Sequence, residues 1–270
     1  MTEGMVSVIM GAYNCANTLP EAIDSILGQT YENLQLIICN DCSTDETDAV
    51  LQAYAAKDAR IVLLQNDANS GLAASLNHCL RYVQGQYVAR MDGDDVSVRD
   101  RFEKQVRFLQ EHPQFDLVGC TMRRFNDAGT ADVVSKPESV SANSMRRIIP
   151  FNHATIMTYP RVYEALNGYT VAKHTLRAED YELWFRFFHA GFSGYNMQEA
   201  LYLVREDMNA IRRRTFRSRR RAFQVTRFGF RLLGFPRHWL IPKLLRFLAK
   251  SMVPYRCIGW YRSWQKKHRK

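Results

Sequence analysis

Four short apolar runs, rich in β-branched residues, recur through the first third of the chain. They are VSVIM (6–10), LQLIIC (34–39), RIVLL (60–64) and QYVARM (86–91). Runs of this length and composition, separated by polar segments, predict β-strands.

Segments with helical spacing lie between and after these runs. One apolar stripe comprises Leu72, Leu76, Cys79 or Leu80, and Val83, and a second comprises Phe102, Val106 and Leu109. Each stripe predicts a helix with one face on a sheet. Strands and helices in regular succession predict an α/β fold, with a mainly parallel sheet covered by helices on both faces.

The size and composition of the chain fit a globular protein. With 270 residues, 46% of them hydrophobic and 24% charged, it has room for one large domain and an appendage, or for two small domains. The opening MTEGMVSVIMGAYNC has no basic cluster, and its apolar run is too short for a signal peptide. We therefore expect a cytoplasmic protein.

The six cysteines are scattered without the spacing of a disulfide framework, which predicts free thiols. The CNDC at 39–42 has the spacing of a zinc or redox site. It has no second Cys/His pair at a useful distance, so we do not predict a metal there.

Charge is distributed unevenly along the chain. Lys and Arg minus Asp and Glu give 17 − 25 = −8 for residues 1–204 and 20 − 2 = +18 for residues 205–270. An acidic body with a basic C-terminal segment predicts a polyanionic partner for that segment, either a membrane surface or a nucleic acid.

Polar and acidic loops follow the predicted strands. They are GAYN (11–14), NDCSTDET (40–47), NDANSG (66–71) and DGDD (92–95). In a parallel sheet the ligand site lies beyond the carboxyl ends of the strands. None of the loops has a glycine-rich phosphate-binding motif. A nucleoside diphosphate could therefore bind among these carboxylates only with a cation between them, and Mg²⁺ or Mn²⁺ is the usual choice.

Asp92 and Asp94 are the candidate ligands of this cation, although a solvated turn would explain the same residues. Asp95 belongs to the same acidic cluster, with the alternative that it only faces solvent or caps the helix near VRDRFEKQ. In NDCSTDET, Ser43 or Thr44, with Glu46 or Thr47, is expected to cap the following helix.

Five motifs together resemble a known family. VSVIMGAYN, NDCSTDET, NSGLAASLN, RMDGDD and AEDYELWFR, in this order and at these intervals, closely resemble the inverting glycosyltransferases of family 2. That family has the GT-A fold, a Rossmann-like α/β sheet. The resemblance covers roughly residues 4–205 and stops before the basic segment.

The resemblance implies a nucleoside site on the first two loops. Ala12, Tyr13 and Asn14 would flank the nucleoside, and Asp41 would bond to the base, commonly uracil. Where relatives often have DDGS, this chain has NDCS, so Cys42 replaces the glycine of the turn.

It also implies roles for four acidic residues. Asp92 would lie toward the ribose and the metal, and Asp94 on the metal. In AEDYELWFR, Asp180 would be the general base, with Glu179 assisting or orienting it. The alternative is that Glu179 and Asp180 only start a helix, where acidic residues suit the dipole. His153 is a possible substrate contact, although a lone histidine is more often structural.

The chemistry requires the same parts. Displacing a nucleoside diphosphate from an anomeric carbon with inversion needs a base beside the acceptor hydroxyl and stabilisation of charge on the leaving group. Asp180 would supply the first and the metal the second, without a covalent intermediate.

The C-terminal segment predicts a helix that lies in a membrane interface. RRRTFRSRRR (212–221) precedes WLIPKLLRFLAKSMV (239–253), which has one leucine stripe and no run long enough to span a bilayer. The stripe comprises Leu240, Leu244, Leu245 and Leu248, and Trp239, Trp260, Tyr261 and Trp264 are expected at the depth of the lipid headgroups. The alternative is a helical cap packed on the body.

We thus expect a GT-A catalytic domain over 1–205, with its nucleotide-sugar half at about 1–95 and its acceptor half at about 96–205. Residues 206–270 would attach it peripherally to the inner face of the cell membrane. The expected function is metal-dependent transfer of a sugar from a nucleotide sugar to a lipid-linked or saccharide acceptor in cell-surface polysaccharide or lipopolysaccharide synthesis. We expect the donor to be a UDP-sugar. The alternatives are a sugar nucleotidyltransferase and a non-enzymatic nucleic-acid binder.

Overall fold

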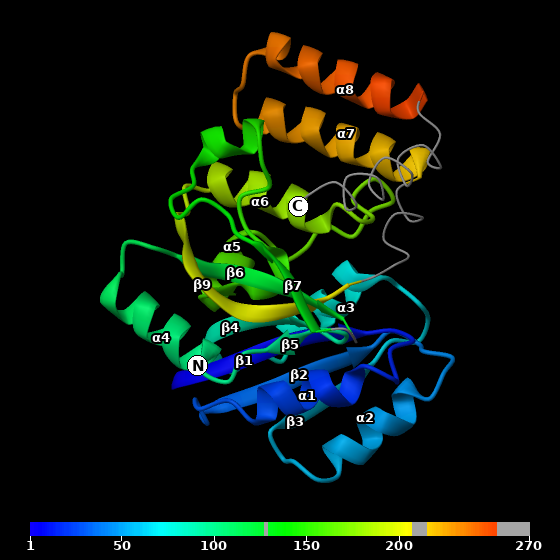
Figure 1. The fold of residues 1–270 in the computed structure, drawn as a ribbon, viewed down its shortest axis with the longest axis vertical. Helices are drawn as coiled ribbons and strands as arrows, with labels where there is room; N and C mark the ends of the chain where they lie inside the picture. The colour runs from blue at the N-terminus through cyan, green and yellow to red at the C-terminus, as the bar shows by residue number, and fades with distance from the viewer. Residues whose placement is uncertain (127–128, 207–214, 253–270) are drawn as a thin grey trace.

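The computed structural model describes residues 1–126, 129–206 and 215–252 (Figure 1). A central sheet has the strand order β3-β2-β1-β4-β8-β6-β9-β5, with β7 beside β6. Its first half contains β1 (Thr2–Ala12), β2 (Leu34–Asn40), β3 (Ile61–Gln65) and β4 (Gly85–Asp92), all paired in parallel. These are the four strands that the apolar runs predicted.

The second half of the sheet is mixed. It contains β5 (Val96–Ser97), β6 (Leu117–Asn126), β7 (Gly129–Val134), β8 (Met157–Thr158) and β9 (Gly194–Arg205). β6 and β9 are parallel, whereas β8 joins β4 to β6 in antiparallel fashion and β5 pairs antiparallel with β9. The predicted α/β class is confirmed, and the parallel arrangement dominates only its N-terminal half.

Helices cover both faces of the sheet, as predicted. They are α1 (Leu19–Leu27), α2 (Thr47–Ala55), α3 (Leu72–Leu80), α4 (Arg101–Glu111), α5 (Pro160–Ala165) and α6 (Glu179–His189), with short 3₁₀ turns η1 (Ala142–Arg146) and η2 (His153–Thr155). A hydrophobic core lies on each face of the sheet. Alternate residues of β1 belong to one core or the other, because successive side chains of a strand point to opposite faces. Val8 and Met10 pack with α1 and α4, and Ile9 packs with α3 and α6.

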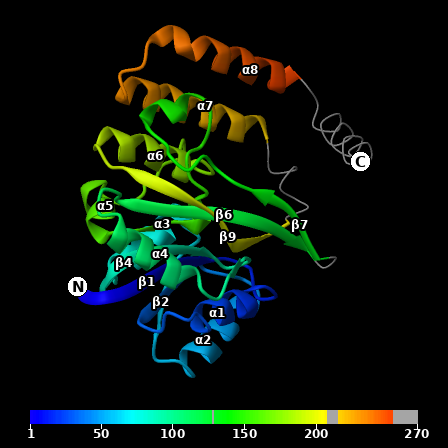
Figure 2. The ribbon, with the colours of Figure 1, turned by 60° about the vertical axis from the view of Figure 1, so that its left-hand side comes forward.

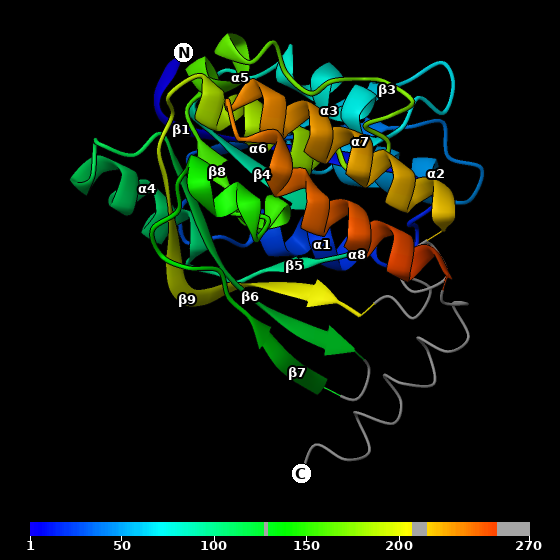
Figure 3. The ribbon, with the colours of Figure 1, turned by 90° about the horizontal axis from the view of Figure 1, so that it is seen from above.

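Two further helices form a hairpin outside α6. α7 (Phe216–Leu232) packs on α6, the turn η3 (Arg237–Leu240) follows, and α8 (Ile241–Met252) runs back along α7 (Figures 1 and 3). A Cβ at Gly229 would lie 2.1 Å from the ring of Phe185, so only glycine permits this close approach of α7 to α6. Figure 2 shows α8 as the outermost layer, farthest from the sheet.

Several smaller features bear on the sequence predictions. Gly191 follows α6 with φ +84°, the conformation expected after a helix end, and Trp184 is fully buried. Cys15, Cys39, Cys42, Cys79 and Cys120 are free thiols, and Cys257 lies outside the described residues. Within the described ranges, no helix has both the length and the apolar composition needed to cross a bilayer.

Candidate active site

A cavity of about 660 Å³ opens where β1 and β4 end. Tyr13 and Asn14 line it from the loop after β1, and Asp92 and Asp94 line it from the loop after β4. Arg205, the last residue of β9, closes another side. Four residues that the sequence nominated thus meet at the carboxyl edge of the sheet, together with one that it did not.

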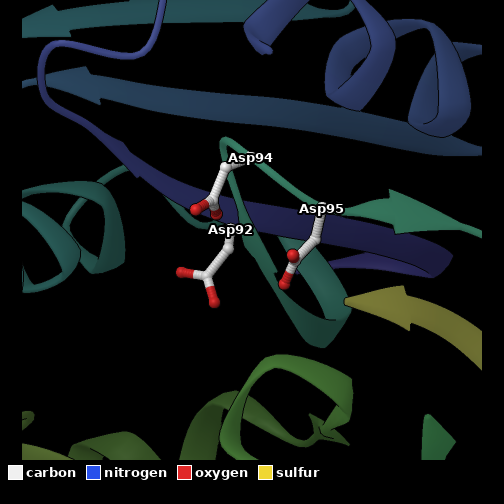
Figure 4. Close-up of side chains that lie close together, drawn as sticks. All are labelled: Asp92, Asp94 and Asp95. Carbon is white, nitrogen blue, oxygen red and sulfur yellow. The ribbon is translucent and has the colours of Figure 1, made fainter. Parts of the chain in front are cut away.

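Three carboxylates cluster at this edge. Ligand oxygens of Asp92, Asp94 and Asp95 all lie within 4.8 Å of one another, and Figure 4 shows the three side chains leaning to the same side of the loop. Burial, followed by the charges of Asp92 and Asp94, raises the pKa of Asp95 to about 8. An all-oxygen set of crowded carboxylates has the donor chemistry of a Mg²⁺ or Mn²⁺ site, since a divalent cation would relieve the repulsion.

The alternative for Asp95, a side chain that only faces solvent or caps the next helix, was wrong. Its side chain neither faces solvent nor caps the next helix: Asp95 is only 3% exposed, and Asp100 stands at the start of α4. The reason is β9, which pairs with β5 directly after the loop and covers it. The amide of Arg205 donates to Oδ1 of Asp95 at 2.8 Å.

The carboxylate of Asp92 pairs with a buried arginine on the same strand. Both terminal nitrogens of Arg90 donate to the two carboxylate oxygens of Asp92. Burial lowers the pKa of Arg90, but the charge of Asp92, the nearby tyrosines Tyr202 and Tyr169 and the hydrogen bond to Asp92 together raise it above its usual value. Because the side chain of Asp92 remains 31% exposed, the pair fixes its direction and leaves it open to the cavity.

Arg205 holds the same loop from the other side. Its Nε donates to the carbonyl oxygen of Asp94 at 3.0 Å, its guanidinium pairs with Glu21, and it lies 4.4 Å from the ring centroid of Phe125. No motif in the sequence marks Arg205, because its role depends on how β9 crosses the sheet.

The loops after β1 and β2 are tied together by side chains. The amide of Asn14 donates to Oγ of Ser43 at 3.1 Å, and Oδ1 of Asn14 accepts from the amide of Thr44 at 2.8 Å. The expected capping by Ser43 or Thr44 is therefore wrong: α2 begins after Glu46 without a side-chain cap bond. Ser43 and Thr44 bond instead to Asn14, which lines the cavity.

The predicted nucleoside contacts differ in accessibility. Tyr13 is exposed at the cavity, whereas Ala12 is buried and its carbonyl oxygen accepts from the amide of Asp41 at 2.8 Å. Cys42, at the position where relatives often have glycine, has φ +58°. The turn thus keeps a left-handed conformation, although its residue has a side chain.

Asp41 is buried and bonded within the protein. Its Oδ1 accepts from Nδ2 of Asn66 at 2.7 Å and from the amide of Ser70 at 2.9 Å, and its Oδ2 accepts from the amide of Gly71 at 2.8 Å. Asp41 therefore shapes the loop that leads into α3. Its contact with a base stays a prediction.

Asp180 lies in the first turn of α6. Burial, together with the charge of Glu179, raises the pKa of Asp180, whereas a bond to the Tyr181 amide and the charge of Arg90 oppose the rise. The charge of Arg90 thus acts on Asp180 as well as on its hydrogen-bonded partner Asp92. Oε1 of Glu179 accepts from the amide of Arg177 at 2.8 Å, which fixes the turn before the helix.

His153 belongs to an aromatic network. Its Nε2 lies 2.8 Å from the hydroxyl of Tyr169, which lies 2.9 Å from the hydroxyl of Tyr163. Trp184 meets the histidine ring edge-on, with 6.0 Å between centroids. Burial, with a smaller effect of Arg90, lowers the pKa of His153 well below its usual value, so the ring is neutral. Contact with substrate stays a prediction.

The model of glycosyl transferase family 2 matches residues 7–168, more than half of the chain. The chain belongs to this family. The putative glycosyltransferase EpsE of Bacillus subtilis is 50% identical over 212 residues, which cover 78% of this chain and 76% of EpsE. The putative teichuronic acid biosynthesis glycosyltransferase TuaG of the same organism is 30% identical over 77% of this chain and 81% of its own length.

Further relatives carry more specific names. WfaP of Escherichia coli, named as a UDP-Glc:alpha-D-GlcNAc-diphosphoundecaprenol beta-1,3-glucosyltransferase, is 28% identical over 71% of this chain and 73% of its own. The relatives of this family 2 enzyme thus include proteins named for teichuronic acid biosynthesis and for glucosyl transfer to a diphosphoundecaprenol-linked sugar.

Solved structures agree on the fold. S. aureus TarS 1–349 in complex with UDP-GlcNAc superposes with a TM-score of 0.69 at 19% identity, over 84% of this chain and 66% of that chain. The mannosyltransferase PcManGT from Pyrobaculum calidifontis, in complex with GDP-Man and Mn²⁺, gives 0.67 at 18% identity, over 98% of this chain and 81% of that chain. The predicted GT-A fold is confirmed.

Proposed function

We propose that this family 2 enzyme catalyses metal-dependent, inverting transfer of a sugar from a nucleoside diphosphate donor to a hydroxyl group. The observation that carries the proposal is the carboxylate cluster of Asp92, Asp94 and Asp95 beside a cavity at the edge of the sheet. A buried Arg90 connects that cluster electrostatically to Asp180.

Each residue has a defined task in this reaction. Asp180 takes the proton of the acceptor hydroxyl as its oxygen attacks the anomeric carbon. The bond from that carbon to the diphosphate oxygen breaks, and the nucleoside diphosphate leaves from the opposite face, which inverts the configuration. Asp92 and Asp94 would hold Mn²⁺ or Mg²⁺, which supplies charge neutralisation for the diphosphate. Glu179 orients the turn that carries Asp180.

The donor we propose is a UDP-sugar. Tyr13 and Asn14 provide the walls for the nucleoside, and Asp41 would recognise the base. WfaP is named for UDP-Glc and TarS is seen with UDP-GlcNAc, which supports uridine, whereas PcManGT is seen with GDP-Man and Mn²⁺, which supports the metal.

The acceptor we propose is lipid-linked or an oligosaccharide of a cell-surface polysaccharide or lipopolysaccharide. The name of WfaP specifies a diphosphoundecaprenol-linked acceptor. Peripheral attachment to the inner face of the membrane through residues 206–270 would bring such an acceptor to a cytoplasmic donor. The +18 charge of residues 205–270 supports this placement.

A panel of nucleotide sugars with Mn²⁺ or Mg²⁺, scored for release of nucleoside diphosphate, tests the proposal. We expect the wild type to turn over one donor and Asp94→Ala to lose that turnover, while Asp67→Ala, which removes an exposed carboxylate outside the cluster, retains it. Release of pyrophosphate instead would identify a nucleotidyltransferase, and turnover by Asp94→Ala without metal would refute the proposal.

A further inference from the structure

The outer helix α8 presents an apolar stripe to solvent. Ile241, Leu244, Leu245 and Leu248 are 55%, 40%, 60% and 47% exposed and recur at the spacing of one helix face. The side of α8 next to this stripe makes the contact with α7, where the ring of Phe247 lies 5.5 Å from that of Phe223. The stripe therefore takes no part in packing α8 against α7. An exposed apolar patch of this kind is typical of an interaction surface.

The helical hairpin that carries this stripe is strongly cationic. Residues 215–252 contain ten Lys and Arg residues and no Asp or Glu. At the start of α8, a cavity of about 430 Å³ is lined by Arg146, the last residue of η1, by the following Arg147 and by Lys243, with Trp239 against it. The guanidinium of Arg146 lies 3.5 Å from the ring centroid of Trp239. A cavity lined by three cations and no carboxylate has the chemistry to accept a phosphate group.

We propose that the outer face of α8 docks on a membrane that contains anionic phospholipid. The stripe from Ile241 to Leu248 enters the boundary between headgroups and acyl chains, and Arg146, Arg147 and Lys243 bind a lipid phosphate. We define this face and its cavity as the α8 surface. The inference deepens the proposed function, because it rests on a lipid-linked acceptor as the reason for membrane contact.

This surface fits a lipid bilayer better than other partners. A nucleic acid would pair with the cations but would leave the exposed leucines in contact with water or phosphate. A second copy of the chain, docked through the same face, would bring two sets of cations together without an acidic group to offset them. An anionic bilayer offers both an apolar interior for the stripe and negative charge for the cations.

The hairpin also orients the catalytic domain. α7 is fixed to α6 by Gly229 and by Phe230, whose ring meets that of Phe185 edge-on at 6.2 Å. α6 begins with Glu179 and Asp180. Docking through α8 would therefore set the orientation of α6, which carries the proposed general base. A fixed orientation of this base is needed if the acceptor is held in the membrane.

Trp239, which we expected at headgroup depth, is half-buried against the body, because η3 turns the chain inward before α8 begins. Its position at headgroup depth stays a prediction. Trp260, Tyr261 and Trp264 lie outside the described residues. The sequence left a helical cap and an interfacial helix as alternatives. α7 packs on the body as a cap does, whereas α8 exposes its stripe, and its contact with a membrane stays a prediction.

Flotation with lipid vesicles tests the apolar part. The full chain is mixed with vesicles of phosphatidylcholine, with or without an equal share of phosphatidylglycerol. We expect binding only with phosphatidylglycerol, and a loss of about tenfold or more for the double variant Leu245→Asp with Leu248→Asp. Val133→Asp, a matched change at an exposed valine on β7, should bind as the wild type does.

The phosphate cavity is tested in the same assay. The double variant Arg147→Gln with Lys243→Gln should bind phosphatidylglycerol vesicles more weakly by a factor of about 30, from about fivefold per cation. Arg107→Gln, an equally cationic position on α4, should change little. Donor hydrolysis measured without lipid should be the same in all these variants, so a failure of docking is distinguishable from a failure of the proposed chemistry.

Three results would overturn the inference. Equal flotation of the wild type and the leucine variant would show that the stripe does not contact lipid. Tight retention on DNA at physiological salt, lost in the Arg147 and Lys243 variant, would assign the surface to a nucleic acid. A lipid-free dimer that the leucine variant converts to monomer would assign it to a second copy of the chain.

Discussion

Arg90 and Asp92 lie two residues apart on the same face of β4, and both terminal nitrogens of Arg90 donate to the carboxylate of Asp92. The arginine is buried while the aspartate is open to the cavity. The strand thus carries a candidate metal ligand and the group that orients it. Arg90 also acts electrostatically on Asp180, so one buried cation influences both sides of the proposed reaction.

Replacing Arg90 with lysine should weaken the site. Lysine keeps the charge but cannot make the two parallel bonds to Asp92, so we expect turnover to fall by about 10- to 100-fold. Kinetics over a series of Mn²⁺ concentrations measure the effect. Arg60→Lys is the matched control, because Arg60 also bonds to an aspartate two residues away, Asp58, but at a partly exposed site away from the cavity. A wild-type rate for Arg90→Lys would show that Asp92 needs no such support.

Activity should fall on the acid side as Asp180 gains a proton. Burial raises the pKa of Asp180, and a base must be ionised to accept a proton, so turnover falls as pH decreases through this raised pKa. Asp180→Asn should reduce turnover by about 10²- to 10⁴-fold and remove this acid limb. Glu179→Gln keeps a hydrogen-bond acceptor for the Arg177 amide, so it should reduce turnover much less than Asp180→Asn does. An unchanged pH profile in Asp180→Asn would exclude it as the base.

The metal-free protein should become less stable as pH rises. The pKa of Asp95 is about 8 when folded and near 4 when unfolded, so between these values the folded state binds more protons. The contribution of Asp95 to the free energy of unfolding is therefore greatest near pH 4 and declines as pH rises toward 8. Asp95→Asn, which can still accept from the Arg205 amide, should raise the melting temperature at pH 8 and have little effect near pH 4. Asp67→Asn is the control, and added Mn²⁺ should reduce the difference.

Cys42→Gly should stabilise the fold. A non-glycine residue at φ +58° is strained, and glycine would relieve about 1 kcal/mol, part of which is lost to its greater freedom when unfolded. Chemical denaturation measures the change in the free energy of unfolding. Transfer activity should be retained, because the side chain of Cys42 makes no part of the proposed chemistry. A destabilised Cys42→Gly would mean that the thiol contributes packing that outweighs the strain.

The first half of the fold was accessible from the sequence because its signals are local. β1 to β4 are short β-branched runs, and Leu76 and Phe102 mark helices that bury one stripe. The acidic loop after β4 was also found, since the carboxyl ends of parallel strands meet at one edge. Asp180 was assigned only through resemblance to the family.

The second half depends on contacts between distant segments. Asp95 is buried because β9, more than a hundred residues later, pairs beside it, and no local pattern reveals this. Arg205 could not be found from the sequence for the same reason, because it reaches the loop after β4 only through the path of β9. Arg90 could have been noticed, because a cation two residues before Asp92 in an apolar strand must point to the same face and find an acid there.

The affinity for nucleoside diphosphate, measured by calorimetry with and without Mn²⁺, tests the central claim most directly. The ligand is the diphosphate product of the donor that the enzyme turns over. Wild type should bind it tightly with Mn²⁺ and lose about 100-fold or more in EDTA, because the carboxylates then repel the phosphates. Asp94→Ala should show little response to Mn²⁺. Equal affinity of the wild type in Mn²⁺ and in EDTA would contradict the account.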